Sequence, residues 1–121
     1  MSSKIWMTAA AAAALALVVV PAAIPASATK VNGTVGPGFT IGLTKAGKKV
    51  TKLTAGKVTF VVSDKASIHN FALDGPNGFE KKVTDVSFKG TKTITLTLKK
   101  GTYKFYCEPH ESTMFGNFKV S

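Results

Sequence analysis

Apolar and polar residues alternate along much of the chain after residue 30. Within Lys92 to Leu98, Ile94, Leu96 and Leu98 alternate with threonines, and Val58, Phe60 and Val62 are spaced in the same way. A period of two is typical of β-strands with one buried face. The pattern predicts strands in these two segments and also in Tyr103 to Cys107, Phe118 to Val120, Val31 to Val35, Phe39 to Leu43 and Ile68 to Leu73.

Glycine-containing turns separate these segments. Examples are Gly36-Pro37-Gly38, Ala55-Gly56 and Lys100-Gly101. Many short strands with frequent turn signals are typical of sandwiches and small barrels, and a chain of 121 residues suits a single domain. We therefore expect an all-β fold, a Greek-key β-sandwich.

The first 28 residues have a different pattern. Lys4 is the only charged side chain before Lys30, the run from Ala9 to Val20 is wholly apolar, and Ala26-Ser27-Ala28 follows. A basic start, a short apolar centre and a small-x-small end are typical of a secretory signal peptide. We predict a signal peptide at residues 1–28, a mature domain at residues 29–121, and export to the periplasm or cell surface. An uncleaved membrane anchor is the alternative.

The charge is strongly positive, with a formal net value of +10 that becomes +9 without Lys4. Such a charge indicates an anionic partner, and we consider an acidic docking surface on another protein and an anionic membrane. A merely solubilising surface is the alternative. Nucleic acid is not expected, because the chain contains no arginine, the usual reader of bases and phosphates.

Residues able to bind a transition metal are rare but clustered. The chain has one cysteine and two histidines, so an internal disulfide is excluded. Cys107, His110 and Met114 fall within eight residues, and His69 lies upstream. Singly, each is more often a packing or surface residue. A thiolate, two imidazoles and a thioether together are the ligands of a trigonal copper site with a weak axial sulfur. Zinc is the competitor, although thioether is not among its usual ligands.

At these residues the chain resembles the cupredoxins, the type 1 blue copper proteins related to plastocyanin, pseudoazurin and amicyanin. The resemblance is most specific in Ile68-His69-Asn70-Phe71, in the segment from Gly101 to His110, and in Met114-Phe115-Gly116. It implies one type 1 copper ion, with His69, Cys107 and His110 as equatorial ligands and Met114 as the axial ligand. The His-to-Met spacing of three residues differs from that of plastocyanin or amicyanin.

The resemblance also implies roles for residues around the ligands. Asn70 would tie the two ligand loops together, and Pro109 would remove a backbone N–H near the cysteine sulfur. His110 would be the electron port, with Phe115 and Pro109 as an apolar rim. Tyr106 could form a second route to a partner, although an ordinary exposed tyrosine is the simpler interpretation. Tyr103 could form a tyrosine corner.

The predicted function is one-electron transfer between redox partners by an exported, monomeric, non-enzymatic protein. Three alternatives remain open. A copper-delivery protein would use the same ligands, an oxidase or reductase would need a further metal centre, and a metal-free sandwich would leave the clustered ligands unexplained. No histidine remains for a second centre once His69 and His110 are used.

Overall fold

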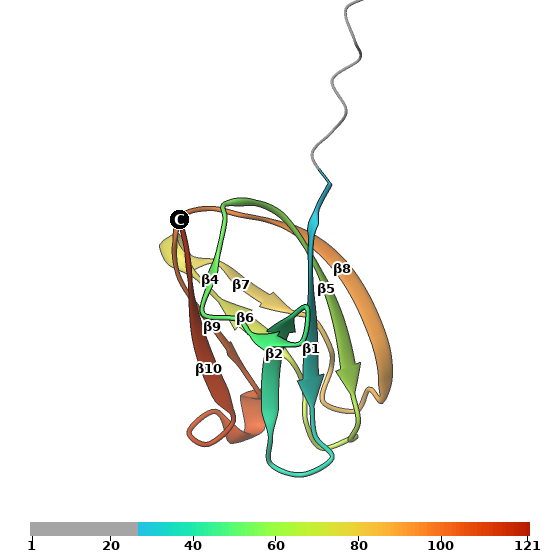
Figure 1. Cartoon of the computed structure of the whole chain (residues 1–121). Coiled ribbons are helices and arrows are strands. Elements are labelled where there is room, and N and C mark those ends of the chain that lie inside the picture. The colour runs from blue at the N-terminus through green and yellow to red at the C-terminus, as the bar shows by residue number, and fades with distance from the viewer. Residues whose placement is uncertain (1–26) are drawn as a thin grey trace, which may run out of the picture.

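The computed structural model describes residues 27–121, and the predicted signal peptide lies almost entirely outside them. No helix in the described part of the chain is long and apolar enough to cross a membrane. The described residues form two five-stranded sheets packed face to face (Figure 1). This confirms the predicted all-β sandwich.

The first sheet has the strand order β3-β2-β1-β5-β8. Its strands are β1 (Thr29–Val35), β2 (Ile41–Lys45), β3 (Lys48–Lys49), β5 (Gly56–Asp64) and β8 (Gly90–Leu98). β1 pairs in parallel with β5, and the other pairings are antiparallel. The chain leaves this sheet after β3 and returns as β5, so neighbouring strands need not be consecutive, as expected for Greek-key connections.

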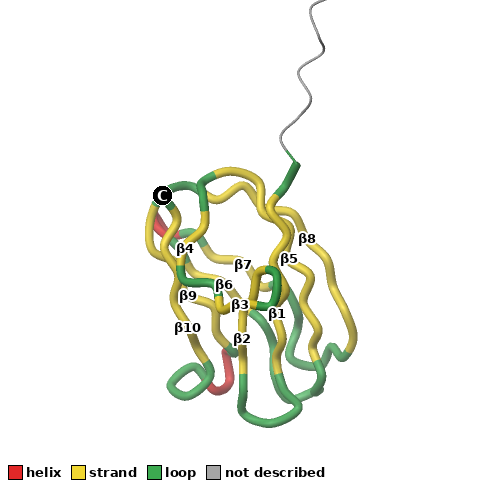
Figure 2. The backbone as a smooth tube through the Cα atoms, viewed as in Figure 1, coloured by secondary structure: helices red, strands yellow, loops and turns green. Residues whose placement is uncertain are grey.

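The second sheet has the order β4-β10-β9-β6-β7. Its strands are β4 (Lys52–Leu53), β6 (Ala72–Asp74), β7 (Glu80–Lys82), β9 (Gly101–Tyr106) and β10 (Phe115–Val120). Two short 3-10 helices, η1 (Pro76–Gly78) and η2 (Glu108–His110), lie at opposite ends of the sandwich (Figure 2). β3, β4 and β7 are too short to produce a recognisable alternation in the sequence.

The hydrophobic core lies where the predicted inward residues meet. Val58, Phe60 and Val62 of β5 are fully buried, and Tyr103 and Phe105 of β9 are almost so. The threonines of β8 stay exposed while its isoleucine and leucines turn inward. The period-two pattern therefore assigned the buried faces of the long strands correctly.

The expected strand from Ile68 to Leu73 is wrong in its first half. Regular pairing begins only at Ala72, and residues 65–71 form a loop. Three consecutive residues of this segment, His69, Asn70 and Phe71, are buried, whereas a strand with one exposed face would bury only every second residue. The amide of Phe71 donates to the hydroxyl of Thr84 at 2.8 Å instead of joining a strand ladder.

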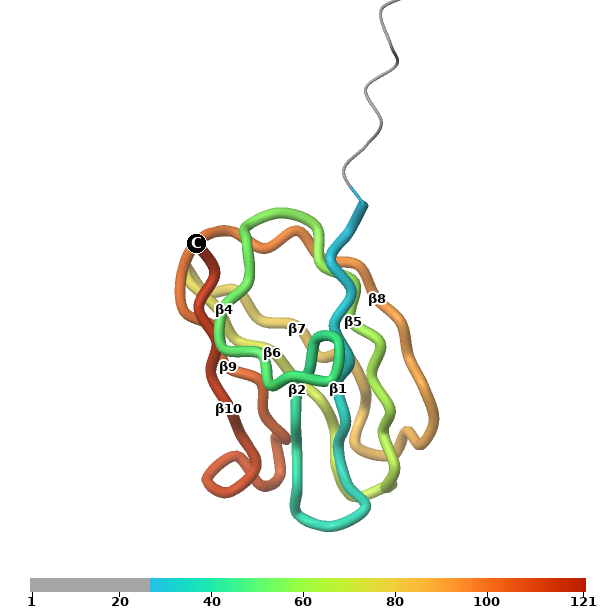
Figure 3. The backbone as a smooth tube through the Cα atoms, viewed as in Figure 1, coloured from blue at the N-terminus to red at the C-terminus, as the bar shows by residue number. Residues whose placement is uncertain are grey.

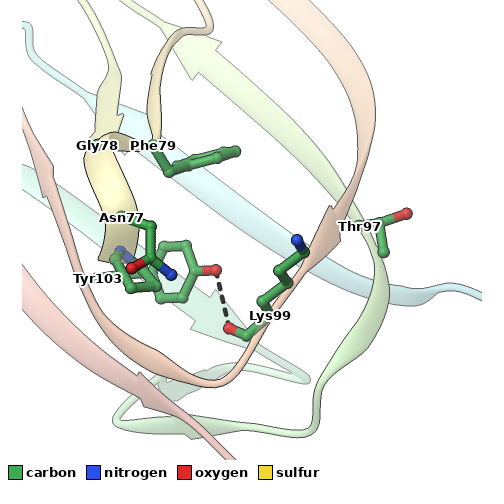
Figure 4. A pocket seen from close by; sticks show the side chains of 7 residues that line it. Asn77, Gly78, Phe79, Thr97, Lys99 and Tyr103 are labelled. Atoms are coloured by element: carbon green, nitrogen blue, oxygen red, sulfur yellow. Dashed lines mark hydrogen bonds between the residues drawn. The ribbon is translucent and has the colours of Figure 1, made fainter.

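Tyr103 closes the end of the sandwich that lies away from η2. Its hydroxyl donates to the carbonyl of Lys99 at 2.8 Å, across the turn that joins β8 to β9 (Figure 4). A tyrosine hydroxyl bonded to the backbone a few residues upstream is the geometry of a tyrosine corner. The aromatic ring stacks on Phe118 of β10, with 5.3 Å between the centroids, so the corner also anchors the last strand.

Candidate metal centre

Three loops meet at one end of the sandwich (Figure 3). They are residues 36–40 between β1 and β2, residues 65–71 between β5 and β6, and residues 107–114 between β9 and β10. Loops from both sheets can converge here because the strands preceding them all end at this edge. Each predicted ligand lies in the second or the third of these loops.

The structure brings His69, Cys107 and His110 together. The two imidazole Nδ1 atoms are 3.1 Å apart, and the thiol Sγ of Cys107 lies 3.6 Å from Nδ1 of His69 and 3.7 Å from Nδ1 of His110. His69 and Cys107 are fully buried, whereas His110 is half-buried. The three ligating atoms thus point at one shared position.

The loop after Cys107 is held by backbone hydrogen bonds. The amide of Cys107 donates to the carbonyl of Met114 at 3.0 Å, and the amide of Met114 donates to the carbonyl of His110 at 2.8 Å. Met114 is 1% exposed. The loop therefore folds back on itself and keeps its methionine inside, at the same end of the molecule as the other three residues.

These separations suit a first-row metal ion. Two imidazole nitrogens, each about 2.1 Å from one ion, are at most about 4.2 Å apart, and a nitrogen and a thiolate sulfur are at most about 4.4 Å apart. The three distances given above fall inside these limits. No second cluster of metal-binding His, Cys, Asp or Glu side chains occurs within residues 27–121. A structural zinc ion would lack its fourth firm ligand here, whereas a trigonal copper site needs only a weak axial sulfur.

Asn70 joins the two loops that carry the metal-binding side chains. Its side-chain oxygen accepts a hydrogen bond from the amide of Glu108 at 2.7 Å, and its side-chain nitrogen donates to the carboxylate of Glu108 at 2.9 Å. Asn70 is fully buried and follows His69, and Glu108 follows Cys107. The tie expected for Asn70 is therefore present.

The loop between β1 and β2 packs against both imidazoles. The ring of Phe39 meets the His69 ring edge-on at 5.3 Å and the His110 ring at 4.9 Å, measured between centroids. Gly36 has a φ of 73°, and a Cβ built there would lie 3.2 Å from Cδ2 of His69. Neither contact was expected from the sequence, because nothing in the local pattern around Phe39 connects it to a histidine thirty residues away.

An acidic side chain is buried in the same region. Asp64, the last residue of β5, is 2% exposed, and one of its carboxylate oxygens has no hydrogen-bond partner within the described residues. Burial raises the pKa of Asp64 above its usual value, although the amide of Ala66, the hydroxyl of Thr84 and the nearby His69 oppose the shift. No local pattern in the sequence indicates a buried acid at this strand end.

Tyr106 is not the freely exposed tyrosine of the simpler interpretation. Its side chain is half-buried, and its hydroxyl donates to the carboxylate of Asp74 on the neighbouring strand β6 at 2.9 Å. Burial and the bond to Asp74 raise the pKa of Tyr106 well above its usual range. The phenol therefore stays protonated at neutral pH and links β9 to β6.

A soft thiol, two imidazoles and a buried thioether at one end of a β-sandwich define the class of type 1 copper sites. The cluster is consistent with one type 1 copper ion. Residues 40–121 match the model of the family described as copper binding proteins, plastocyanin/azurin family, and the chain belongs to this family. The predicted cupredoxin membership is thereby confirmed.

Several solved structures are similar to this chain. Auracyanin A, a blue copper protein from the green thermophilic photosynthetic bacterium Chloroflexus aurantiacus, is 18% identical and superposes with a TM-score of 0.53, covering 78% of this chain and 100% of auracyanin A. A rusticyanin variant is 26% identical, with a TM-score of 0.49 and coverage of 78% and 79%. An amicyanin variant is 15% identical, with a TM-score of 0.49 and coverage of 78% and 85%. Among curated protein sequences, none matches the chain.

Proposed function

We propose that this blue copper protein is a one-electron carrier, with His69, Cys107, His110 and Met114 as the ligands of its copper ion. The observation that carries the proposal is the convergence of the two Nδ1 atoms and the Cys107 sulfur within 3.7 Å of one another. Copper bound there would supply a single electron by cycling between Cu(II) and Cu(I). The protein residues would hold the site, exclude water and present it to a partner.

A rigid ligand set favours rapid electron transfer. His69 and Cys107 are locked by burial, and the paired hydrogen bonds between Asn70 and Glu108 fix the loops that carry them. Because these contacts are made by the protein alone, the ligands need not rearrange when the charge of the ion changes. Little reorganisation per electron is then required, which is the property a carrier needs.

His110 is the proposed exit for the electron. It is the one half-buried member of the four ligands, and the others are almost fully buried. The most exposed large apolar residues of the described chain lie at this end. Phe39, 63% exposed, and Ile68, 54% exposed, belong to two of the loops, and Phe115, 48% exposed, is the first residue of β10. This apolar rim would exclude water when a redox partner docks, and it extends the predicted rim of Pro109 and Phe115 by two residues.

Copper delivery is less well supported than electron transfer. A delivery protein must release its ion, and release requires accessible ligands. His69 and Cys107 are fully buried. Backbone hydrogen bonds between Cys107, His110 and Met114 close the loop that carries these three proposed ligands. The chain also lacks histidines for a second metal centre, so an oxidase or reductase activity is not proposed.

Export remains part of the proposal. It rests on the N-terminal pattern of Lys4, the apolar run from Ala9 to Val20 and the Ala26-Ser27-Ala28 end. Sequencing the N-terminus of the protein purified from the expressing cell would test it. A first residue of Thr29 is expected after cleavage, and a retained Met1 would support the anchor alternative.

Electron transfer and copper delivery can be separated on one sample. The copper-loaded protein is reduced and reoxidised repeatedly in the presence of a Cu(I) chelator, and the copper content is measured after each cycle. We expect reversible uptake of one electron per chain, with the ion retained. Transfer of the ion to the chelator on reduction would contradict the carrier proposal and support delivery.

A further inference from the structure

The positive charge is concentrated away from the copper site. The strand ends opposite that site carry Lys30, Lys52, Lys57, Lys99, Lys100 and Lys119, a group called here the lysine pole. All six are exposed, and the adjoining β2–β3 hairpin adds three more lysines. No aspartate or glutamate lies among the residues at these strand ends or in the β2–β3 hairpin. The remainder of the described chain holds six lysines and all six acids.

The strand registers place these lysines at one end. Lys57 pairs with Thr97 at the start of β5, and Lys119 pairs with Thr102 at the end of β10. At the other end of the same strands, Asp64 pairs with Gly90 and Phe115 with Tyr106, beside the copper loops. Figure 1 shows the two ends, with β1 beginning and the chain terminating at the lysine pole.

The fold tolerates unfavourable contacts among these lysines. Lys119 lies directly across from Lys52 between β10 and β4, and Lys45 lies across from Lys48 in the hairpin. Like charges at opposing positions destabilise a sheet. The ion pairs found within residues 27–121, Lys82 with Glu108 and Lys104 with Glu111, both belong to the other half of the molecule. Among the described residues, no ion pair offsets the like charges of the lysine pole.

We propose that the lysine pole lies against an anionic membrane surface, with the copper end directed away from it. Lysines spread over several strand ends suit a diffuse negative surface of lipid headgroups. The fork of arginine, which recognises phosphate bidentately, is absent from the chain. The first described residues, up to Lys30, enter the sandwich at this same end (Figure 1).

The length of the sandwich keeps the copper site outside the field of the membrane. β5 connects the two ends with nine residues, and its eight residue-to-residue steps correspond to about 26 Å at about 3.3 Å per residue. The Debye length at physiological salt is about 8 Å. The apolar rim around His110 then remains open to a redox partner while the pole is bound. This orientation does not depend on which metal the site holds.

The test compares two variants of equal net charge. The pole variant carries Lys30→Gln, Lys57→Gln, Lys99→Gln and Lys100→Gln, and the control variant carries Lys65→Gln, Lys81→Gln, Lys89→Gln and Lys92→Gln. The full chain is expressed, and the exported protein is purified with its N-terminus determined. Sedimentation with vesicles of phosphatidylcholine, with and without one quarter phosphatidylglycerol, measures binding at several salt concentrations.

Wild-type protein should prefer the anionic vesicles, and the preference should fall as salt rises. Each lysine near the surface contributes about fivefold, so the pole variant should lose at least about 100-fold and the control variant less than about fivefold. Circular dichroism checks that both variants are folded. An uncleaved N-terminal run would insert into neutral vesicles as well as anionic ones. The lysine pole is therefore tested by the binding to anionic vesicles that exceeds the binding to neutral vesicles.

Two results would overturn the proposal. Equal losses in the two variants would show that net charge alone is responsible. Absence of a preference for anionic vesicles would also overturn it, and pole-dependent binding to a soluble acidic protein would then assign the lysines to a protein partner. Neither result depends on electron transfer, so the test stands apart from the proposed function.

Discussion

The two ends of the sandwich are built from the same strands but differ in almost every other property. The copper end buries His69 and Cys107, exposes Phe39, and lies in the half of the molecule whose charges balance. The opposite end is closed by the Tyr103 corner and covered by lysines without acids. One rigid framework thus supports a metal site at one edge and, as proposed, attachment to a membrane at the other.

The largest effect is expected from the thiol of the copper end. Cys107→Ser removes the soft ligand that gives the site its preference for copper, so the protein should lose its intense visible absorption completely. Lys99→Gln at the other end should leave that absorption unchanged. Visible spectra and copper analysis of the two variants measure this absorption. A blue Cys107→Ser protein would show that the thiol is not a copper ligand.

A smaller but still large effect is expected for Asn70→Ala. The change removes the acceptor of the part-buried bond from the Glu108 amide and the donor to its carboxylate, and it loosens both ligand loops. The free energy of unfolding should fall by about 2 kcal/mol, or about 1 kcal/mol for each of the two lost bonds. Asn117→Ala, at an exposed asparagine of β10, is the control and should change it little. Chemical denaturation of the copper-free protein gives both values, and equal effects would disprove the tie.

Phe39→Ala tests the apolar rim. Removing an exposed ring that touches both imidazoles should weaken the contact between protein molecules, with little change in fold stability. The rate of electron exchange between oxidised and reduced copies, measured by NMR line broadening, should fall about tenfold, equivalent to about 1.4 kcal/mol. An unchanged rate would mean that electrons leave by another surface.

Tyr103→Phe tests the closure of the lysine end. Loss of the bond to the carbonyl of Lys99 should cost about 1 kcal/mol of stability without altering the copper spectrum. Tyr106→Phe on the same strand removes a bond to the charged carboxylate of Asp74, so a loss of about 1 kcal/mol or more is expected there as well. Unchanged stability in Tyr103→Phe would contradict the assignment of the stabilising corner.

The smallest effect concerns the acid beside the copper loops and appears only with pH. Because burial raises the pKa of Asp64, the folded protein holds that proton more tightly than the unfolded chain, whose aspartates titrate near about 3.9. Stability is therefore fully present below that pH and decreases as pH rises through the raised pKa. Asp64→Asn should gain up to about 1 kcal/mol over wild type at pH 7 and nothing at pH 3.5. Denaturation of the copper-free proteins at both pH values checks this, and a gain independent of pH would contradict it.

The sequence predicted the long strands and the ligand cluster for physical reasons. β5, β8 and β9 each have one buried face, which leaves a period of two, and the chain has so few His, Cys and Met residues that their grouping stands out. The segment around His69 was expected to be a strand but is a loop, because the amide of Phe71 bonds to the hydroxyl of the distant Thr84 and not to a neighbouring strand.

Other features depend on which segments meet in space. Phe39 contacts the two imidazoles, and Asp64 is buried beside them, only because three loops converge. A local sequence pattern does not indicate which loops converge. The lysine pole likewise joins Lys30, Lys52, Lys99 and Lys119, which are far apart along the chain and come together through strand register. The net charge indicated an anionic partner but did not indicate which surface would bind it.

The central claim is that the copper end holds one type 1 copper ion through Cys107 and the two histidines. The most direct measurement adds Cu(II) to the purified wild-type protein and records its visible and EPR spectra. One equivalent per chain should give an intense blue thiolate-to-copper absorption with narrow hyperfine splitting. A colourless protein that binds zinc in preference to copper, or a copper signal with the wide splitting of nitrogen and oxygen ligands alone, would contradict it.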